Sequence, residues 1–562
     1  MTTADAIITA NTIHTMDPQN PEVESIAIKD GRVLAMGDLA KVERSCDATT
    51  HRVAFPGVLT PGLTDAHTHI VMGTIWTRGL DLTDLSFGQV ADSLARHAEQ
   101  PSSDDWIWGW GLDPNIFPHE FDGRIFDTAT SGRPMFLRMR DGHSAVCNSA
   151  AMRLAAITGR EEFRDESRIG TDGSGAPTGY LVEFSAMDLV LRHCPEETIP
   201  ALGKRLFGLL TEMAATGLTG THVLDFNPPA LEVMTWIEEN HDLPLRVRFS
   251  PLIFPGTDES DWETIASIQG TGGRRWIVDG VKFMIDGTVD NGSAWLREPD
   301  EFGQGTTSIW TDTDDYRHAL KYFARKGIST ATHAIGDQGV SFVLDSLEEL
   351  GDMRLKAAHR IEHIETIPDE TVVRFAELDI AASMQPIHGT HHTKADGTDN
   401  WSVRLGPVRA GHGWRCRDLR AAGAVVALGS DWPIAPFDPL EMMADSVLRR
   451  PARRPDTPPI RLEQSLSIKQ AFEGYTSHAA KAANVSNLSG SIGIGKYADF
   501  TVFGSDPLLA HADELADISV LATFVDGQQY QGETRARLNS YLEPIDSDNQ
   551  PITSETGRKL DD

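Results

Sequence analysis

The stretch Val58-Leu59-Thr60-Pro61-Gly62-Leu63-Thr64-Asp65-Ala66-His67-Thr68-His69 decides how the rest of the chain is interpreted. An apolar, extended segment ends here in two histidines that are two residues apart. Successive side chains of a strand point to opposite faces, so His67 and His69 present their imidazoles on the same face. That spacing suits two imidazoles that bind one metal ion. A lone His-x-His also occurs in structural and surface positions, and residues further along the chain favour the metal.

Short apolar runs alternate with helical periods through the middle of the chain. The runs with strand character are 219–224, 245–250, 380–384 and 424–429, together with those that carry Lys282, His333 and His363. Strands that alternate with helices indicate a parallel sheet, and about eight such units indicate an α/β fold of the closed (β/α)8 barrel, or TIM barrel, type. In such barrels the chemistry lies at the carboxyl ends of the strands, where each candidate ligand falls.

The two ends of the chain have a different texture, with short strands separated by turn residues. We predict a composite β-sandwich domain from 1–60 and 485–545, a barrel over 61–484, an inserted subdomain at about 75–185, and a polar tail over 546–562. The insertion is expected because the gap between His69 and Lys282 is long for three βα units of roughly 30 residues each.

The composition and charge of the chain limit the class of protein and the partners to expect. Of 562 residues, 40% are hydrophobic and 23% are charged, which is ordinary for such a chain. The net charge of −32 disfavours nucleic acid and anionic membrane surfaces as partners. No apolar run reaches membrane-helix length, and the first residues lack a secretory signal pattern. Four scattered cysteines fit a reduced, cytoplasmic setting. We also expect the chain to form a homo-oligomer, a dimer.

Lys282 lies in an apolar strand-like segment, where an ammonium is costly unless it is paired. One interpretation is an ion pair with Asp279 or Asp286. The other is a lysine that is neutral long enough to capture CO2. The resulting carbamate is an anion with two oxygens, and it can bridge two cations.

His333, His363 and Asp431 each end a strand-like run. Either histidine alone could be a satisfied core residue, but two histidines that end successive strands favour metal binding. A carboxylate at the mouth of the last strand can ligate a metal and accept a proton from metal-bound water. The alternative for Asp431 is an N-cap of the following helix.

Several further residues are candidates for substrate contact. His143, Trp108 and Glu183 all lie in the inserted segment. A surface carboxylate is the alternative for Glu183, and packing inside the insertion is the alternative for Trp108. The histidines of 388–392 follow a strand in a loop, where solvated side chains are expected, with contact to substrate or a metal as the alternative.

These pieces together resemble the amidohydrolase superfamily, close to its amidohydrolase 3 or YtcJ-like branch, which includes N-substituted formamide deformylases. The matching segments are 24–33, 61–69, 140–149, 280–283, 333–337, 360–363, 429–433 and 495–500. The resemblance covers nearly the whole chain. The segments 286–292 and 388–392 differ from what the branch leads us to expect.

The resemblance implies a metal-loaded (β/α)8 barrel with a β-sandwich made from both chain ends. The implied ligands are His67, His69 and Asp431 for one ion and His333 and His363 for a second, with carboxylated Lys282 as the bridge. Imidazole, carbamate and carboxylate ligands suit Zn, with Mn or Fe as alternatives.

The function expected from this set is hydrolysis of a non-peptide C–N bond in a small amide, N-acyl or N-formyl, by a metal-bound hydroxide. Asp431 would move the proton, and His143 would donate a hydrogen bond to the developing oxyanion. A hydrolytic deaminase and a decarboxylase or hydratase on the same scaffold are alternatives. A deaminase of this superfamily usually has a glutamate shortly after the histidine of the fifth strand, where this chain has Asp337. A catalytically silent binding protein is the remaining alternative.

Overall fold

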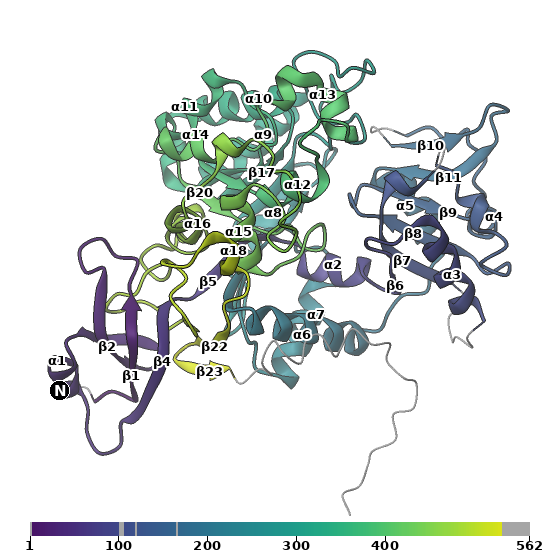
Figure 1. Cartoon of the computed structure of the whole chain (residues 1–562). Coiled ribbons are helices and arrows are strands. Elements are labelled where there is room, and N and C mark those ends of the chain that lie inside the picture. The colour runs from purple at the N-terminus through teal and green to yellow at the C-terminus, as the bar shows by residue number, and fades with distance from the viewer. Residues whose placement is uncertain (1–2, 100–105, 118–120, 164–166, 531–562) are drawn as a thin grey trace, which may run out of the picture.

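A computed structural model describes residues 3–99, 106–117, 121–163 and 167–530 of the chain, and the predicted tail at 546–562 lies outside this range. The centre of the molecule is built from parallel strands covered by helices (Figure 1). Within the described ranges, no helix combines the length and the apolar character needed to cross a membrane.

Two parallel sheets form this centre, in the orders β15-β13-β12-β5 and β14-β16-β17-β18-β19-β20. Their strands are β5 (Leu63–Thr68), β12 (Leu218–Val223), β13 (Arg246–Phe249), β14 (Leu252–Ile253), β15 (Trp276–Val278), β16 (Val281–Met284), β17 (Thr330–Ala334), β18 (His359–His363), β19 (Ala381–Met384) and β20 (Val426–Leu428). Strands β12, β17, β18, β19 and β20 are buried at every position, as expected for strands with both faces covered.

The ladder of hydrogen bonds between the central strands is interrupted at two places. The structure therefore confirms a parallel α/β architecture but does not show the closed barrel that we predicted. The first sheet passes into the second where β13 and β15 bend into β14 and β16. Pro251 has no N–H to donate, and Gly280 has φ of 104°, a conformation that favours glycine. At the other junction, β5 and the segment after β20 share a single bridge, between Thr68 and Trp432.

Helices follow most of these strands and pack on their outer faces. They are α6 (Ile199–Ala215), α7 (Ala230–Asn240), α8 (Glu259–Ser267), α9 (Thr313–Arg325), α10 (Asp337–Glu348), α11 (Asp369–Glu377), α14 (Cys416–Ala421), α15 (Pro439–Leu448) and α16 (Ile468–Tyr475). The largest hydrophobic core cluster runs through these helices and strands. Buried apolar side chains at helical spacing, such as Leu206, Leu210 and Met213 of α6, explain why these segments are helical.

The two chain ends combine in one seven-stranded sheet, in the order β23-β22-β21-β4-β1-β2-β3. Its strands are β1 (Ala6–His14), β2 (Glu22–Lys29), β3 (Arg32–Gly37), β4 (His51–Pro61), β21 (Phe500–Phe503), β22 (Val520–Val525) and β23 (Gln528–Tyr530). Strand β4 leads directly into β5, so this sheet fixes the start of the segment that carries His67.

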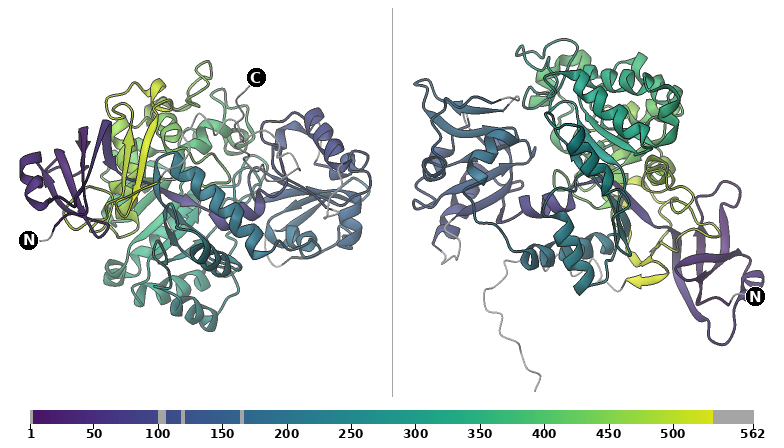
Figure 2. Two further views of the ribbon diagram at one scale, coloured as in Figure 1. Left: turned by 90° about the horizontal axis from the view of Figure 1, so that it is seen from below. Right: turned by 180° about the vertical axis from the view of Figure 1, so that it is seen from behind.

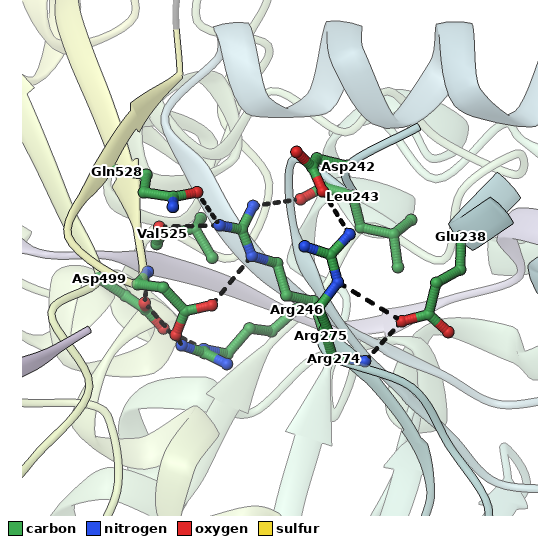
Figure 3. Close-up of polar contacts among 10 residues, drawn as sticks. Glu238, Asp242, Leu243, Arg246, Arg274, Arg275, Asp499, Val525 and Gln528 are labelled. Atoms are coloured by element: carbon green, nitrogen blue, oxygen red, sulfur yellow. Dashed lines mark hydrogen bonds and ion pairs between the residues drawn. The ribbon is translucent and has the colours of Figure 1, made fainter. Parts of the chain in front are cut away.

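Ion pairs attach this terminal sheet to the central strands (Figure 3). Arg246 of β13 pairs with Asp499 and Asp526, and Arg275 pairs with Asp526 at 2.9 Å. Arg275 also donates to the Oε1 atom of Gln528 at 2.8 Å. These arginines neutralise carboxylates that come from the far end of the sequence, so the C-terminal part of the terminal sheet is held to the central strands.

The segment between α2 (Ile70–Trp76) and α6 contains a six-stranded sheet in the order β10-β11-β9-β8-β7-β6. Its strands are β6 (Leu80–Asp81), β7 (Ile107–Leu112), β8 (Met135–Met139), β9 (Ser144–Cys147), β10 (Arg168–Thr171) and β11 (Pro177–Val182), packed with α3 (Phe87–Ala98), α4 (Ser149–Leu154) and α5 (Phe184–Leu191). Figures 1 and 2 show this subdomain and the terminal sheet on opposite sides of the central strands.

Candidate metal centre and active site

His67 is completely buried at the end of β5, and a carboxylate fixes its ring. Its Nδ1 lies 2.7 Å from the Oε2 atom of Glu362, and the other oxygen of Glu362 lies 2.8 Å from the Nε atom of Arg360. Burial alone would raise the pKa of Glu362, but the Arg360 guanidinium and His67 lower it to about 2. The ionised carboxylate therefore accepts the Nδ1 proton, so that in the neutral ring the Nε2 lone pair can bind a metal.

His69 has the same arrangement with a different carboxylate. It stands at the N-terminus of α2, and its Nδ1 lies 2.8 Å from the Oδ2 atom of Asp225, which follows β12. The Nε2 atoms of His67 and His69 lie 3.2 and 3.4 Å from the Oδ1 atom of Asp431. The ligand atoms of these three residues all lie within 4.8 Å of one another, which is the spacing that one metal ion requires.

Close packing between β5 and the segment after β20 positions Asp431. The backbone N–H groups of His67 and Ser430 both donate to the Oδ1 atom of Asp65, at 3.1 and 3.0 Å. Gly429 leaves no room for a side chain, because a Cβ there would lie 2.5 Å from the backbone nitrogen of His67. Burial would raise the pKa of Asp431, but His67 and His69 hold it below its usual range, so this side chain is an anion.

A second group of ligand atoms shares Asp431 with His363 and His388. The Nδ1 atom of His363 lies 3.9 Å from the Oδ2 atom of Asp431, and the Nε2 atom of His388 lies 3.8 Å from the same oxygen. The prediction that His388 is a solvated loop residue is wrong. Pro386 starts the short helix α12 (Pro386–His392) directly after β19, and His388 on that helix is buried.

His333 lies beside this group but makes a different contact. Its ring centroid is 4.4 Å from that of His363, and its Nε2 lies 3.2 Å from the carbonyl oxygen of Gly287. Burial holds the pKa of His333 well below its ordinary value, so the ring is neutral. The structure brings His333 and His363 together, while the role of His333 as a ligand stays a prediction.

Lys282 on β16 lines the same cavity as these histidines and is only 2% exposed. Within the described part of the chain, its Nζ atom has no hydrogen-bond partner. Asp279 instead pairs with Arg248, and the Asp286 carboxylate accepts hydrogen bonds from the backbone of Ile335 and Gly336. Burial lowers the pKa of Lys282 to about 8. The ion-paired interpretation of this lysine is therefore not supported.

The unsatisfied atoms of this region fit a bound cation. Among the buried nitrogen atoms of the described residues that have no hydrogen-bond partner are His67 Nε2, His363 Nδ1, His388 Nε2 and Lys282 Nζ. A buried polar atom without a partner is costly, and clusters of such atoms mark sites where a further group binds. Imidazole and carboxylate donors are the ligands that Zn and similar divalent metals prefer.

His143 reaches the same cavity from the inserted subdomain. Its Nδ1 lies 2.9 Å from the Oε2 atom of Glu183, and its ring centroid is 6.1 Å from that of His333. Burial would lower the pKa of His143, but the Glu183 carboxylate raises it to about 9. Glu183 is not one of the described residues that line the cavity and instead contacts His143; its role in substrate binding stays a prediction.

The cavity has a volume of about 320 Å³ and is lined mostly by apolar atoms. Its aromatic walls come from Trp76, Phe184, Trp401 and Trp414. Trp108, which we predicted to contact substrate, is not among the described lining residues. Strand β7 lies inside the inserted sheet, and the indole of Trp108 packs against its neighbours there, as the alternative interpretation has it.

Sequence reasoning did not single out the carboxylates that orient the histidines. Asp225 directly follows a predicted strand, which is the same signal that identified Asp431, so it could have been found. Glu362 stands next to His363 on a buried strand, and strict alternation would place it on the other side of that strand. His363 has φ of 74°, however, and both side chains reach His67. The contact between Glu362 and His67 depends on strand order, which sequence alone does not fix.

Comparison with known proteins agrees with this architecture. Protein LONG AFTER FAR-RED 3 of Arabidopsis thaliana is 29% identical over 94% of this chain and 91% of its own length. N-substituted formamide deformylase of Arthrobacter pascens is 22% identical over 93% of this chain and 97% of its own length.

Among solved structures, that of an uncharacterized metal-dependent hydrolase from Pyrococcus horikoshii OT3 matches with a TM-score of 0.71 at 21% identity. The match covers 90% of this chain and 99% of the other, and it shows a shared fold. The profile of the amidohydrolase family matches residues 57–531, which is most of the sequence and includes every candidate ligand. The chain belongs to the amidohydrolase family, as the resemblance in its sequence predicts.

Proposed function

We propose that this chain is a metal-dependent hydrolase that cleaves a non-peptide C–N bond, an N-acyl or N-formyl amide bond, in a small molecule. The observation that carries the proposal is the convergence of His67, His69 and Asp431 next to a cavity of about 320 Å³. The similarity to a relative named N-substituted formamide deformylase supports the choice of an amide, although that similarity is only 22% identity.

His67, His69 and Asp431 would hold one divalent ion, for which Zn is the first candidate. Asp431 would also contact a second ion, together with His363. That second site would be completed either by His388 alone or by His333 and Lys282 together. When bound, such ions activate water at neutral pH and polarise the carbonyl oxygen of an amide.

Lys282 would contribute as a carbamate. A neutral amine is the form that reacts with CO2, and burial makes this form accessible by lowering the pKa of Lys282 to about 8. The Nζ atom would form a bond to the carbon of CO2 and lose one proton to solvent. The product would be an anion with two oxygens beside the histidines. These two oxygens would be available as metal ligands, where the unmodified Lys282 has a nitrogen atom without a partner.

The side chains around the reacting bond have separate tasks. The Asp431 anion would accept a proton from the attacking water and return it to the leaving nitrogen, as a general base and then a general acid. Protonated His143 would donate a hydrogen bond from Nε2 to the developing oxyanion, because Glu183 occupies its Nδ1. The apolar walls from Trp76 and Phe184 would exclude bulk water from the bond.

A substrate screen tests the proposal. Metal-replete protein would be incubated with matched N-formyl and N-acetyl amines, with esters and with lactams, and release of primary amine would be followed. We expect turnover of amides by the wild-type chain and loss of that turnover in Asp431→Asn. Absence of turnover across all amides, with divalent metal bound, would overturn the proposal.

A further inference from the structure

One wall of the cavity carries two carboxyl groups that belong to neither group of ligand atoms, Glu365 and Asp290. The same helix, α13 (Asn400–Ala410), holds both. Trp401 Nε1 donates to the Oε2 atom of Glu365 at 2.7 Å, and Asn400 Nδ2 donates to the Oδ1 atom of Asp290 at 2.9 Å. The orientation of both carboxyl groups is thus built into the fold.

In the part of the chain that the structure describes, neither carboxyl group forms an ion pair, and neither accepts a side-chain hydrogen bond at its second oxygen. Lys282 is the one lysine or arginine among the described residues that line the cavity. His143, the other cationic side chain of the cavity, is already paired with Glu183, and a carboxyl group without an ion-pair partner attracts a positive charge.

Aromatic side chains complete this wall. The rings of Trp401 and Trp414 lie 4.6 Å apart, and both line the cavity. Trp414 is 2% exposed, and its Nε1 has no hydrogen-bond partner among the described residues, so a buried donor is left for a ligand atom. The guanidinium carbon of Arg461 already lies 5.3 Å from each ring centroid, so this indole pair accommodates a cation on one side, because the ring quadrupole attracts cations.

We infer that the cavity selects amides that carry an alkylammonium or amidinium group, such as mono-N-acylated diamines, and that Glu365 and Asp290 are the specificity-determining residues. This inference rests on the proposed function for the reaction itself. The cation would pair with the free oxygens of the two carboxyl groups, the Trp414 N–H would donate to an acceptor of the substrate, and the alkyl chain would lie along the apolar walls. Amides with a carboxylate in the same position would be repelled.

The test uses the metal-replete full chain and three matched series of substrates. N-formyl diaminoalkanes of increasing length carry the cation, N-formyl alkylamines of equal length are neutral, and N-formyl ω-amino acids carry the anion. The variants are Glu365→Gln and Asp290→Asn, which keep an acceptor for Trp401 and Asn400. Glu377→Gln is the control, because Glu377 is an exposed carboxylate outside the cavity.

We expect kcat/KM for the best cationic substrate to exceed that of its neutral match by about 10- to 100-fold, the value of a hydrogen bond to a charged group. Glu365→Gln and Asp290→Asn should each remove most of this ratio, and Glu377→Gln should keep it. Equal or better turnover of neutral or anionic amides would overturn the inference, as would a ratio that survives in both variants.

Calorimetric binding separates failure of the subsite from failure of the proposed reaction. An alkylammonium ion and the alcohol of equal length would be titrated into the same proteins, with no hydrolysis required. If no amide is turned over but the ammonium binds more tightly than the alcohol, and only in proteins with both carboxylates, the subsite stands and the proposed reaction falls. If the two ligands bind equally, the subsite falls.

Discussion

Replacement of Glu362 by glutamine should weaken metal binding and strongly destabilise the protein, whereas replacement of Asp225 by asparagine should weaken metal binding with a much smaller loss of stability. Both carboxylates hold the Nδ1 atom of a ligand histidine, at 2.7 and 2.8 Å. They differ in one respect. Glu362 also neutralises the buried Arg360 at 2.8 Å, while no arginine or lysine pairs with Asp225 in the described chain.

The magnitudes follow from these contacts. Loss of a carboxylate that orients a metal-binding histidine typically costs about 10- to 100-fold in metal affinity, and this applies to both variants. Glu362→Gln also leaves the Arg360 guanidinium buried without a counter-ion, which costs about 3 kcal/mol. Asp225→Asn keeps an oxygen that can accept from His69 but removes its charge, and this weaker hydrogen bond costs about 1 kcal/mol.

The assay has two parts and uses chelator-stripped protein. Competition with a chromophoric chelator gives the Kd for Zn, and urea unfolding followed by tryptophan fluorescence gives the midpoint of the metal-free protein. The reasoning is refuted if the two variants lower the urea midpoint equally. It is also refuted if either variant binds Zn as tightly as the wild-type chain.

Three further changes test other residues of the site. Asp431→Asn should lower kcat/KM by about 10²- to 10⁴-fold without unfolding the chain, and near wild-type kinetics would reduce Asp431 to a structural role. Lys282→Ala should lose metal, measured by mass spectrometry, and added acetate should restore part of it; full metal content without acetate would contradict a carbamate. In Glu183→Gln the pKa of His143 should fall from about 9 toward its ordinary 6.5, because the carboxylate that raises it is gone. The protonated ring is the donor, so the alkaline limb of kcat/KM should move to lower pH; an unchanged limb would exclude His143 as that donor.

The positions of the strand-end residues could be predicted from sequence because their signal is local. His67, His69, His333, His363 and Asp431 all follow apolar runs, and parallel strands bring such positions to one edge. Sequence could not show in the same way whether the strands pair continuously into a closed barrel. Whether strands pair continuously depends on bends such as those at Ser250–Pro251 and Asp279–Gly280, which propensity does not reveal.

The surroundings of the site were harder to predict because they depend on contacts between distant segments. His388 looked like a loop residue because the helix that carries it has only seven residues and begins at a proline. Trp108 looked like a pocket wall because tryptophans gather in its segment, yet the inserted sheet uses them for its own packing. The cavity is instead lined by tryptophans that include Trp401 of α13 and Trp414, which follows that helix.

The most direct test of the central claim is amide turnover during titration of Zn into chelator-stripped protein. If His67, His69 and Asp431 hold the catalytic ion, the stripped protein should be inactive. Turnover should rise in proportion to bound Zn and level off at one or two ions per chain. His67→Ala should bind less Zn and recover little activity. Full turnover by the stripped protein, or bound Zn at this cluster without any return of amide hydrolysis, would contradict the account.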